Sequence, residues 1–252
     1  MRLMDHEVLT FCADDAHGAP IMMKADELGI EPTAFIDEIN KNHQESLAKF
    51  GIEYTNYYST HSKENEALVS EIYLDAKSSG YIYKKEIEQC FDEEKQMFLA
   101  DRYVVGECPK CSAKNQYGDG CEECGATYSA TELINPKSSL SGTTPITKIS
   151  EHIFFDLEKA KDDLVNFLDN SSIQKPILGK LSEWLDGDLK SWDISRDAPY
   201  FGFQIPDETE KYFYVWVDAP IGYMASADNW ANKNSHSLAN LWGRESDYEI
   251  HH

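Results

Sequence analysis

Residues 108–124 read Cys-Pro-Lys-Cys-Ser-Ala-Lys-Asn-Gln-Tyr-Gly-Asp-Gly-Cys-Glu-Glu-Cys, so two C-x-x-C pairs are separated by nine residues. Each C-x-x-C folds into a tight knuckle that presents two thiolates to one point, and two such knuckles joined by a short loop close a tetrahedron around Zn²⁺. Because sulfur fills all four positions, none is left for a bound water, and the metal is expected to be structural and not catalytic. We therefore predict that the stretch holds a structural zinc ion through Cys108, Cys111, Cys121 and Cys124.

The alternatives for these four cysteines are two disulfides or four unrelated buried thiols. Disulfides need an oxidising compartment, and the chain begins with no cationic and apolar signal segment. No apolar run approaches the roughly 20 residues that cross a bilayer. We therefore expect a soluble, reduced, cytoplasmic protein in which Cys12 and Cys90 are ordinary buried thiols.

The charge of the chain bears on its partners. Against 23 Lys and Arg residues stand 45 Asp and Glu residues, a formal net charge of −22, and a zinc–tetrathiolate centre adds further negative charge. Such a surface repels phosphate backbones over most of its area. If a nucleic acid is a partner, its main docking surface is expected to lie elsewhere or to be small.

The first part of the chain predicts a strand followed by helices. Residues 6–12 are typical of a buried strand, which ends at the polar stretch 13–20. One helix is predicted to begin at Pro32, and a second is predicted to be capped by Ser62 and to end near Gly80. The second helix is expected to turn Leu68, Ile72 and Ala76 inward.

The helical period disappears from residue 81 to residue 145 and returns at 157–168 and 177–189. Residues 211–218, Lys-Tyr-Phe-Tyr-Val-Trp-Val-Asp, are predicted to form a central strand. The pattern predicts an α/β domain split by an insertion. Its first part is expected at 1–80, the zinc-bearing insertion at 81–193 and its second part at 194–252.

Polar groups at two places are candidates for ligand binding. In open α/β sheets, ligands bind beyond the carboxyl ends of the strands, which is where Asp14 and Asp15 are predicted to lie. A partly desolvated carboxylate there pairs well with an ammonium group, although either residue could instead cap the next helix. Arg196 could bind a carboxylate or a phosphate, or could pair with Asp197 in a structural turn.

Residues 216–223, Trp-Val-Asp-Ala-Pro-Ile-Gly-Tyr, are a third candidate. Trp216 and Tyr223 could bracket a small apolar side chain, and aromatic walls suit a thioether through sulfur–aromatic contact. Ala219 and Gly222 would leave room for it. The alternative is simple core packing of the aromatic rings.

Together and in this order, the segments resemble the bacterial methionyl-tRNA synthetases, a family of class I aminoacyl-tRNA synthetases. The resemblance covers nearly the whole chain. It rests on residues 11–18, 58–62, 97–102, 108–128, 131–134, 192–202 and 211–224.

The resemblance implies a Rossmann-like catalytic domain interrupted by a zinc-containing connective peptide. Such enzymes activate methionine with ATP and Mg²⁺ to methionyl-adenylate and transfer the methionyl group to methionine tRNA. Carried over by motif, Asp15 holds the ammonium group of methionine and Arg196 supports activation. The side-chain pocket is formed by Trp216, Ala219, Pro220 and Tyr223, and zinc is bound by Cys108, Cys111, Cys121 and Cys124.

The sequence departs from the family in two signatures that bind ATP. It contains neither His-x-Gly-His nor Lys-Met-Ser-Lys-Ser, and it lacks the helical anticodon-binding domain that supplies most of the tRNA-docking surface. We therefore expect an internal fragment with an incomplete catalytic domain, inactive alone. A zinc-stabilised binding module and a methionine-binding remnant without catalysis remain as alternatives.

Overall fold

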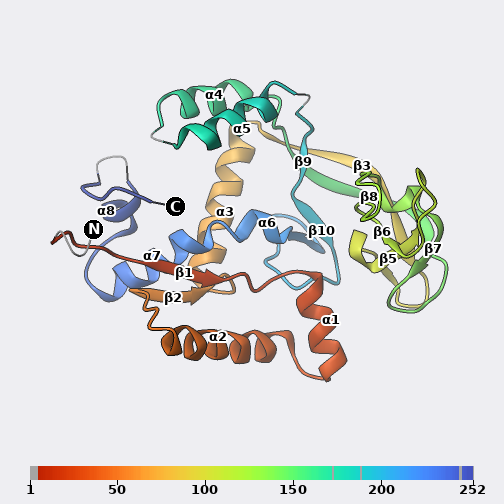
Figure 1. Ribbon diagram of the computed structural model, residues 1–252, viewed down its shortest axis with the longest axis horizontal. Helices are drawn as coiled ribbons and strands as arrows, with labels where there is room; N and C mark the ends of the chain where they lie inside the picture. The colour runs from red at the N-terminus through yellow and green to blue at the C-terminus, as the bar shows by residue number, and fades with distance from the viewer. Residues whose placement is uncertain (1–4, 172, 188, 244–245, 252) are drawn as a thin grey trace. The chain divides into compact units, whose positions relative to one another are not determined.

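The computed structural model describes residues 5–171, 173–187, 189–243 and 246–251 (Figure 1). The chain divides into two compact units. The first unit combines residues 1–76 with residues 200–252, and the second contains residues 77–199. Among the described helices, none combines the length and the apolar composition that a membrane span requires.

A parallel pair of strands organises the first unit. β1 (Phe11–Asp14) lies beside β2 (Asn56–Ser59), with Phe11 opposite Asn56 and Asp14 opposite Ser59. A parallel pair needs a crossover connection, which here contains α1 (Ala19–Leu28) and α2 (Pro32–Lys49). The predicted strand at 6–12 was placed too early, because its partner β2 aligns with residues 11–14 only.

The helices of the first unit begin largely where the sequence places them. α2 starts at Pro32, and α3 (Lys63–Ser78) starts after Ser62, whose Oγ accepts the Asn65 amide at 3.4 Å. Both starts are confirmed. α1 was not predicted, because its first residues are part of the polar stretch that follows β1.

The buried face of α3 differs from the predicted one. Its buried side chains are Glu64, Asn65, Val69 and Tyr73, while Ile72 is 44% exposed. The face is shifted because polar partners fix it: Glu64 Oε1 accepts from the Asn229 side chain at 3.0 Å, and the Asn65 side chain donates to the Thr60 carbonyl at 2.9 Å. Leu68, Ile72 and Ala76 share one face of α3, as predicted, but Leu68 and Ala76 are only half-buried and Ile72 is exposed.

The predicted central strand at 211–218 is also wrong beyond Phe213. β11 (Lys211–Phe213) pairs back on residues 203–205, since the Phe213 amide donates to the Phe203 carbonyl at 2.9 Å. The Val215 amide instead donates to the Tyr200 hydroxyl at 3.1 Å, and the chain turns into α6 (Val215–Asp218). α7 (Gly222–Lys233) and α8 (Leu238–Trp242) follow.

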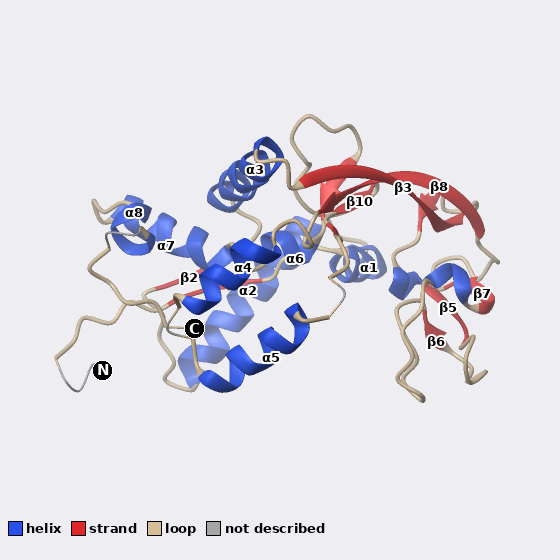
Figure 2. Cartoon of the chain, turned by 90° about the horizontal axis from the view of Figure 1, so that it is seen from above, coloured by secondary structure: helices blue, strands red, loops and turns tan. Residues whose placement is uncertain are grey.

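The second unit is built on two long antiparallel strands (Figure 2). β3 (Ile82–Asp92) pairs with β8 (Ile146–Phe155) from Ile82 opposite Phe155 to Phe91 opposite Ile146. The strand order of this sheet is β4-β3-β8-β9, with β4 at Met97–Phe98 and β9 at Trp192–Asp193. α4 (Lys161–Asp169), α5 (Lys175–Leu185) and β10 (Ser195–Asp197) complete the unit outside the knuckle region.

A smaller sheet carries the cysteine knuckles. Its order is β6-β5-β7, formed by Gln116–Tyr117, Val104–Glu107 and Ile134–Ser138. Short 3₁₀ turns at Asp101–Tyr103 and Ala130–Glu132 lead into β5 and β7. The knuckles therefore extend from the loops on either side of β6.

Candidate functional site

The four cysteine sulfurs form one cluster, all within 4.8 Å of one another. The Sγ atoms of Cys108 and Cys124 are 3.8 Å apart, and those of Cys111 and Cys121 are 3.6 Å apart. A disulfide requires about 2.05 Å, and all four cysteines are free thiols, so the disulfide alternative is wrong. Four sulfurs bound tetrahedrally at about 2.3 Å from Zn²⁺ would lie about 3.8 Å apart. The cluster therefore fits a metal ion of this kind.

The two knuckles share one backbone design. The amides of Ser112 and Gly125 donate to the carbonyls of Cys108 and Cys121, each at 2.9 Å. Both donors have positive φ, 61° and 70°, a conformation that glycine adopts freely and serine at a cost. Each loop thus turns back tightly after its second cysteine, as the spacing predicts.

Backbone amides and neighbouring sulfurs set the charge of the cluster. Burial alone would raise the pKa of Cys108, but hydrogen bonds from the Cys111 and Lys110 amides, at 3.4 and 3.3 Å, lower it to about 6. For Cys111 a backbone hydrogen bond at Ala113 favours the thiolate, yet neighbouring sulfurs raise its pKa to about 12. The Cys108 thiolate therefore forms readily, whereas the neighbouring sulfurs oppose deprotonation of Cys111. A cation removes that resistance, which is the behaviour of a metal-ligating set.

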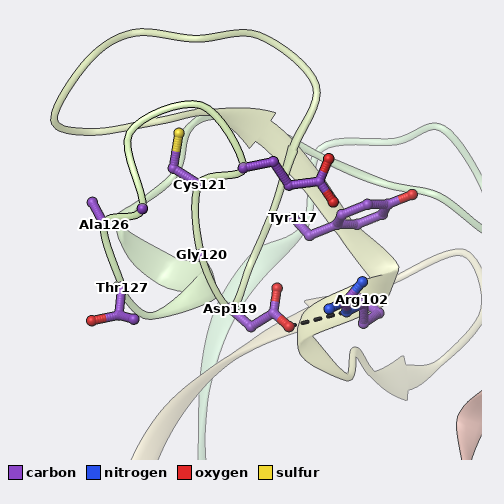
Figure 3. A pocket seen from close by; sticks show the side chains of 9 residues that line it. Arg102, Tyr117, Asp119, Gly120, Cys121, Ala126 and Thr127 are labelled. Atoms are coloured by element: carbon purple, nitrogen blue, oxygen red, sulfur yellow. Dashed lines mark hydrogen bonds and ion pairs between the residues drawn. The ribbon is translucent and has the colours of Figure 1, made fainter.

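A small hollow of about 200 Å³ lies beside the second knuckle (Figure 3). Arg102 Nε donates to Asp119 Oδ2 at 3.0 Å, and its guanidinium lies 5.2 Å from the centroid of the Tyr117 ring. In Figure 3 the Cys121 sulfur points away from this ion pair. The pair holds the knuckle loop without occupying the sulfur cluster.

In the first unit, three polar residues meet beyond the carboxyl ends of β1 and β2. His17 Nδ1 forms a short hydrogen bond with Asp218 Oδ2, and His17 Nε2 lies 2.9 Å from His61 Nδ1. The rings of Phe201 and Phe203 lie 5.4 and 4.6 Å from the His17 ring. We call Asp218, His17 and His61 the histidine cluster. Sequence reasoning missed it, although all three residues belong to segments that it singled out.

Burial controls the charges of this region. Desolvation raises the pKa of Asp218, although the hydrogen bond from His17 opposes the change. Desolvation also raises the pKa of Asp15, and the Asp218 charge adds to the effect while His17 opposes it. The pKa of His61 is lowered by burial and by the neighbouring His17. A cation bound beside Asp15 would therefore offset the desolvation and the Asp218 charge, which both oppose ionisation of this carboxyl group.

Asp14, the last residue of β1, and Asp15, the residue after it, have different roles. Asp14 accepts hydrogen bonds from the Asn40 amide at 2.7 Å, from His43 Nδ1 at 2.8 Å and from the Tyr57 hydroxyl. Neither Asp14 nor Asp15 caps α1, whose N-cap residue is Gly18 without a side-chain cap. The capping alternative is therefore wrong. Asp14 is used in structure, and Asp15 is left exposed at the strand end.

The segment predicted to form an apolar pocket lies against the same strand ends. α7 packs on β1 and β2, and a Cβ on Gly222 would lie 2.7 Å from Thr60 Cγ2 and 3.3 Å from Ala13 Cβ. Only glycine permits this approach. Trp216 is 62% exposed on α6 and Tyr223 is 45% exposed on α7, so neither ring is buried in the core. Ala219 and Pro220 connect the two helices.

Arg196 belongs to the second unit, on β10. Its Nη1 donates to the Ser195 carbonyl at 2.6 Å and lies 3.5 Å from Asp193 Oδ2. Asp197, the partner considered from the sequence, instead interacts with His152 and Gln89. Asp193 therefore lies beside Arg196 as an acidic partner that the sequence did not suggest. Arg196 is described within its own unit, and the remaining predicted site residues outside the knuckles belong to the first unit.

Comparison with known proteins gives a family for the whole chain. Residues 1–252 match the family model described as tRNA synthetases class I (M). A solved Mycobacterium tuberculosis methionyl-tRNA synthetase bound by methionyl-adenylate has a TM-score of 0.66 and 17% identity, covering 98% of this chain and 44% of that one. A second complex of that enzyme with methionyl-adenylate has a TM-score of 0.61 and 16% identity, covering 98% of this chain and 42% of that one. The apo form has a TM-score of 0.54 and 17% identity, covering 86% of this chain and 39% of that one.

These matches concern the fold, since the identities are low. They confirm the predicted mixed α/β synthetase fold, with a cysteine cluster that fits a metal-binding insertion. The chain spans less than half the length of these solved proteins.

Proposed function

The chain belongs to the class I (M) family of tRNA synthetases, and we propose that it forms part of a methionine–tRNA ligase. The reaction joins the carboxylate of methionine to the α-phosphate of ATP, releases pyrophosphate, and then passes the methionyl group to methionine tRNA. Mg²⁺ accompanies ATP. The observation that carries the proposal is an exposed residue, Asp15, at the carboxyl end of β1 in a synthetase fold, whose carboxyl interacts with Asp218 at the end of α6.

Asp15 would bind the ammonium group of methionine. Its raised pKa reflects desolvation and the nearby Asp218 charge, so a bound cation restores the ionised form that these two effects oppose. His17 and Asp218 stay paired beneath it. A cationic ligand would therefore supply the positive charge that favours ionised Asp15.

Trp216, Ala219, Pro220 and Tyr223 would receive the side chain. Two exposed aromatic rings flank small residues here, and a flexible thioether gains from sulfur–aromatic contact. A pocket lined in this way gives a methylene-sized discrimination of about 1–3 kcal/mol. It would therefore separate methionine from shorter or branched side chains.

Cys108, Cys111, Cys121 and Cys124 would hold zinc. A tetrathiolate zinc contributes folding energy and leaves no open position for substrate. Within this proposal the connective peptide is expected at 81–193, and the existence of a compact unit at 77–199 supports that assignment. The free thiols suit a cytoplasmic enzyme of protein synthesis. With a chain charge of −22, we expect the main tRNA-docking surface to lie elsewhere or to be small.

Arg196 would support activation. A guanidinium presents a fork of donors that matches phosphate oxygens and is charged at every working pH. Charge that develops on the transferring phosphate is the main barrier in this chemistry. Arg196 would stabilise that charge.

Calorimetry on the zinc-loaded chain tests the proposal. Methionine is expected to bind with a measurable heat, Asp15→Asn to weaken binding at least tenfold, and the exposed control Glu53→Gln to leave it unchanged. Norleucine keeps the length without the sulfur and reports the thioether contribution. No heat with any of these ligands would contradict the proposal and leave a zinc-binding module as the better function.

A further inference from the structure

A second buried histidine in the other unit has a different environment. His152, on β8, is 1% exposed, with Nδ1 2.7 Å from Asp193 Oδ2 and Nε2 2.9 Å from Asp197 Oδ2. Neutral imidazole has one N–H and imidazolium has two, so two facing carboxylates favour the imidazolium. Burial alone would lower the pKa of His152, but the hydrogen bonds to Asp193 and Asp197 raise it.

Gln89 makes the arrangement around this ring depend on one proton. Gln89 Nε2 lies 3.0 Å from Asp197 Oδ2 and 2.6 Å from His152 Nε2. With the imidazolium, His152 Nε2 donates to Asp197 Oδ2 and cannot accept from Gln89, while Ser150 Oγ donates to Asp197 Oδ1 at 3.0 Å. With a neutral ring protonated on Nδ1, Gln89 would donate to His152 Nε2, and Asp197 would face a lone pair. The carboxylate would then have to move.

Asp193 connects this ring to Arg196. The Asp193 oxygen that accepts from His152 is the one 3.5 Å from Arg196 Nη1. Its other oxygen accepts from the Ser195 amide at 3.1 Å and from the Ser195 hydroxyl at 3.3 Å. The carboxylate is therefore held on both sides, and together with the Ser195 carbonyl, which accepts from Arg196 Nη1 at 2.6 Å, it orients the guanidinium.

We propose that His152 is a positioning residue for Arg196, which it orients through Asp193. The inference rests on the proposed function, in which Arg196 meets anionic reactants. As an imidazolium, His152 donates to both Asp193 and Asp197; a neutral ring has one N–H and can hold only one of them, and loss of the Asp193 bond changes the direction of Arg196. The other charged groups that face the cluster are Lys85, opposite His152 in the β3–β8 register, and Asp101, which interacts electrostatically with Arg196.

Nuclear magnetic resonance on the ¹⁵N-arginine-labelled chain tests the positioning directly. The sequence has four arginines, so the Arg196 Nε–H signal is assigned by Arg196→Lys. In His152→Gln the signal is expected to move toward its free-arginine position, with hydrogen exchange at least tenfold faster. Asp193→Asn is expected to do the same. An Arg196 signal unchanged in His152→Gln overturns the inference.

A control separates positioning from general damage. Ser141 Oγ donates to Asp92 Oδ2 at 2.6 Å in the same unit, so Ser141→Ala also removes a hydrogen bond from a buried carboxylate but has no link to Arg196. It is expected to leave the Arg196 signal in place. If it moves that signal as far as His152→Gln does, the effect is not specific and the inference fails. His152→Asn is the second variant should His152→Gln not fold.

Titration adds a readout that simple packing would not show. The His152 ring signals and the Arg196 signal are expected to share one midpoint above the usual range of histidine, and His152→Gln is expected to remove the Arg196 step. Independent midpoints contradict the coupling.

Activity distinguishes this inference from the proposed function. In the methionine–tRNA ligase of which this chain is proposed to form part, His152→Gln is expected to lower kcat of methionine-dependent ATP–pyrophosphate exchange on the order of 10- to 100-fold, with the methionine KM within twofold. Absence of both methionine binding and exchange in the unmodified protein would overturn the proposed function, while the Arg196 signal still decides the positioning. An unchanged kcat in an active enzyme would overturn the inference.

Discussion

The cysteine knuckles of the second unit and the histidine cluster of the first gather polar atoms by opposite routes. The four sulfurs come from residues 108–124 and are aimed by backbone bonds inside each knuckle. In the histidine cluster, His17 and Asp218 are 201 positions apart in the sequence, and His17 and His61 are 44 positions apart. The knuckles therefore depend on a local loop and, in the proposed function, on a metal, whereas the histidine cluster depends on the packing of the whole first unit. Perturbing each should damage a different part of the molecule.

Removal of the metal should have the largest effect. Structural zinc contributes about 10–16 kcal/mol of apparent binding free energy in small knuckle peptides. Cys111→Ser or a strong chelator is therefore expected to disorder residues 104–138 while β1, β2 and α7 stay folded, as followed by backbone amide spectra. Cys12→Ser is the control and should keep one zinc per chain. Loss of both units together would contradict the contrast.

Asp218→Asn should be the most damaging change to the histidine cluster. Asp218 is fully buried and its carboxylate is the partner of His17, so the change leaves a buried histidine without its carboxylate partner. Breaking a buried pair costs about 3 kcal/mol or more. Urea unfolding should show this loss with zinc content unchanged, and the exposed Glu53→Gln should cost less than about 0.5 kcal/mol. Lost zinc in Asp218→Asn would contradict the independence of the two regions.

Gly222→Ala should cost less, because it only overpacks the contact between α7 and the strand ends. The new Cβ would meet Thr60 Cγ2 at 2.7 Å, and overpacking typically costs about 1–3 kcal/mol. Gly179→Ala on α5, where a Cβ meets nothing within 4 Å, should instead stabilise by up to about 1 kcal/mol. Thermal melts of both variants test the pair. Equal shifts in the same direction would contradict the close approach at Gly222.

Acid should weaken the first unit through His61. Its pKa is lowered in the folded state by burial and by His17, so the unfolded chain binds the proton first. Stability is therefore present above the unfolded pKa of about 6.5 and is lost as pH falls through it toward the folded value. His61→Gln should flatten this part of the pH profile of unfolding. A profile with the same slope in the variant would assign the loss to another group.

Trp216→Ala should have the smallest effect on stability, below about 1 kcal/mol, because the ring is already 62% exposed. Its effect on methionine affinity should be much larger. Calorimetry and thermal melts on the same sample separate the two quantities. A large stability loss would show that the ring is part of the core and not of a binding surface.

The features predicted correctly from the sequence are those that depend on residues close together in the chain. The C-x-x-C spacing defines its own geometry, and the starts of α2 and α3 follow from Pro32 and Ser62. The turn of residues 215–218 into a helix could not be predicted, because it depends on a hydrogen bond from Val215 to the distant Tyr200 hydroxyl. The shifted face of α3 depends likewise on Asn229.

The same division holds for the candidate site. Asp15 was found from its place after a strand, and Trp216 and Tyr223 from a motif, but the link between His17 and Asp218 crosses most of the chain. The available signal was that His17 and Asp218 lie in two segments, 11–18 and 211–224, that the sequence already marked as candidates for ligand binding.

The most direct test of the account is a nuclear Overhauser spectrum of methyl-labelled methionine with the zinc-loaded chain. The account predicts contacts from the methionine methyl group to the rings of Trp216 and Tyr223, and their loss in Asp15→Asn at the same ligand concentration. A methyl signal that stays at its free position at millimolar methionine would contradict the proposed pocket.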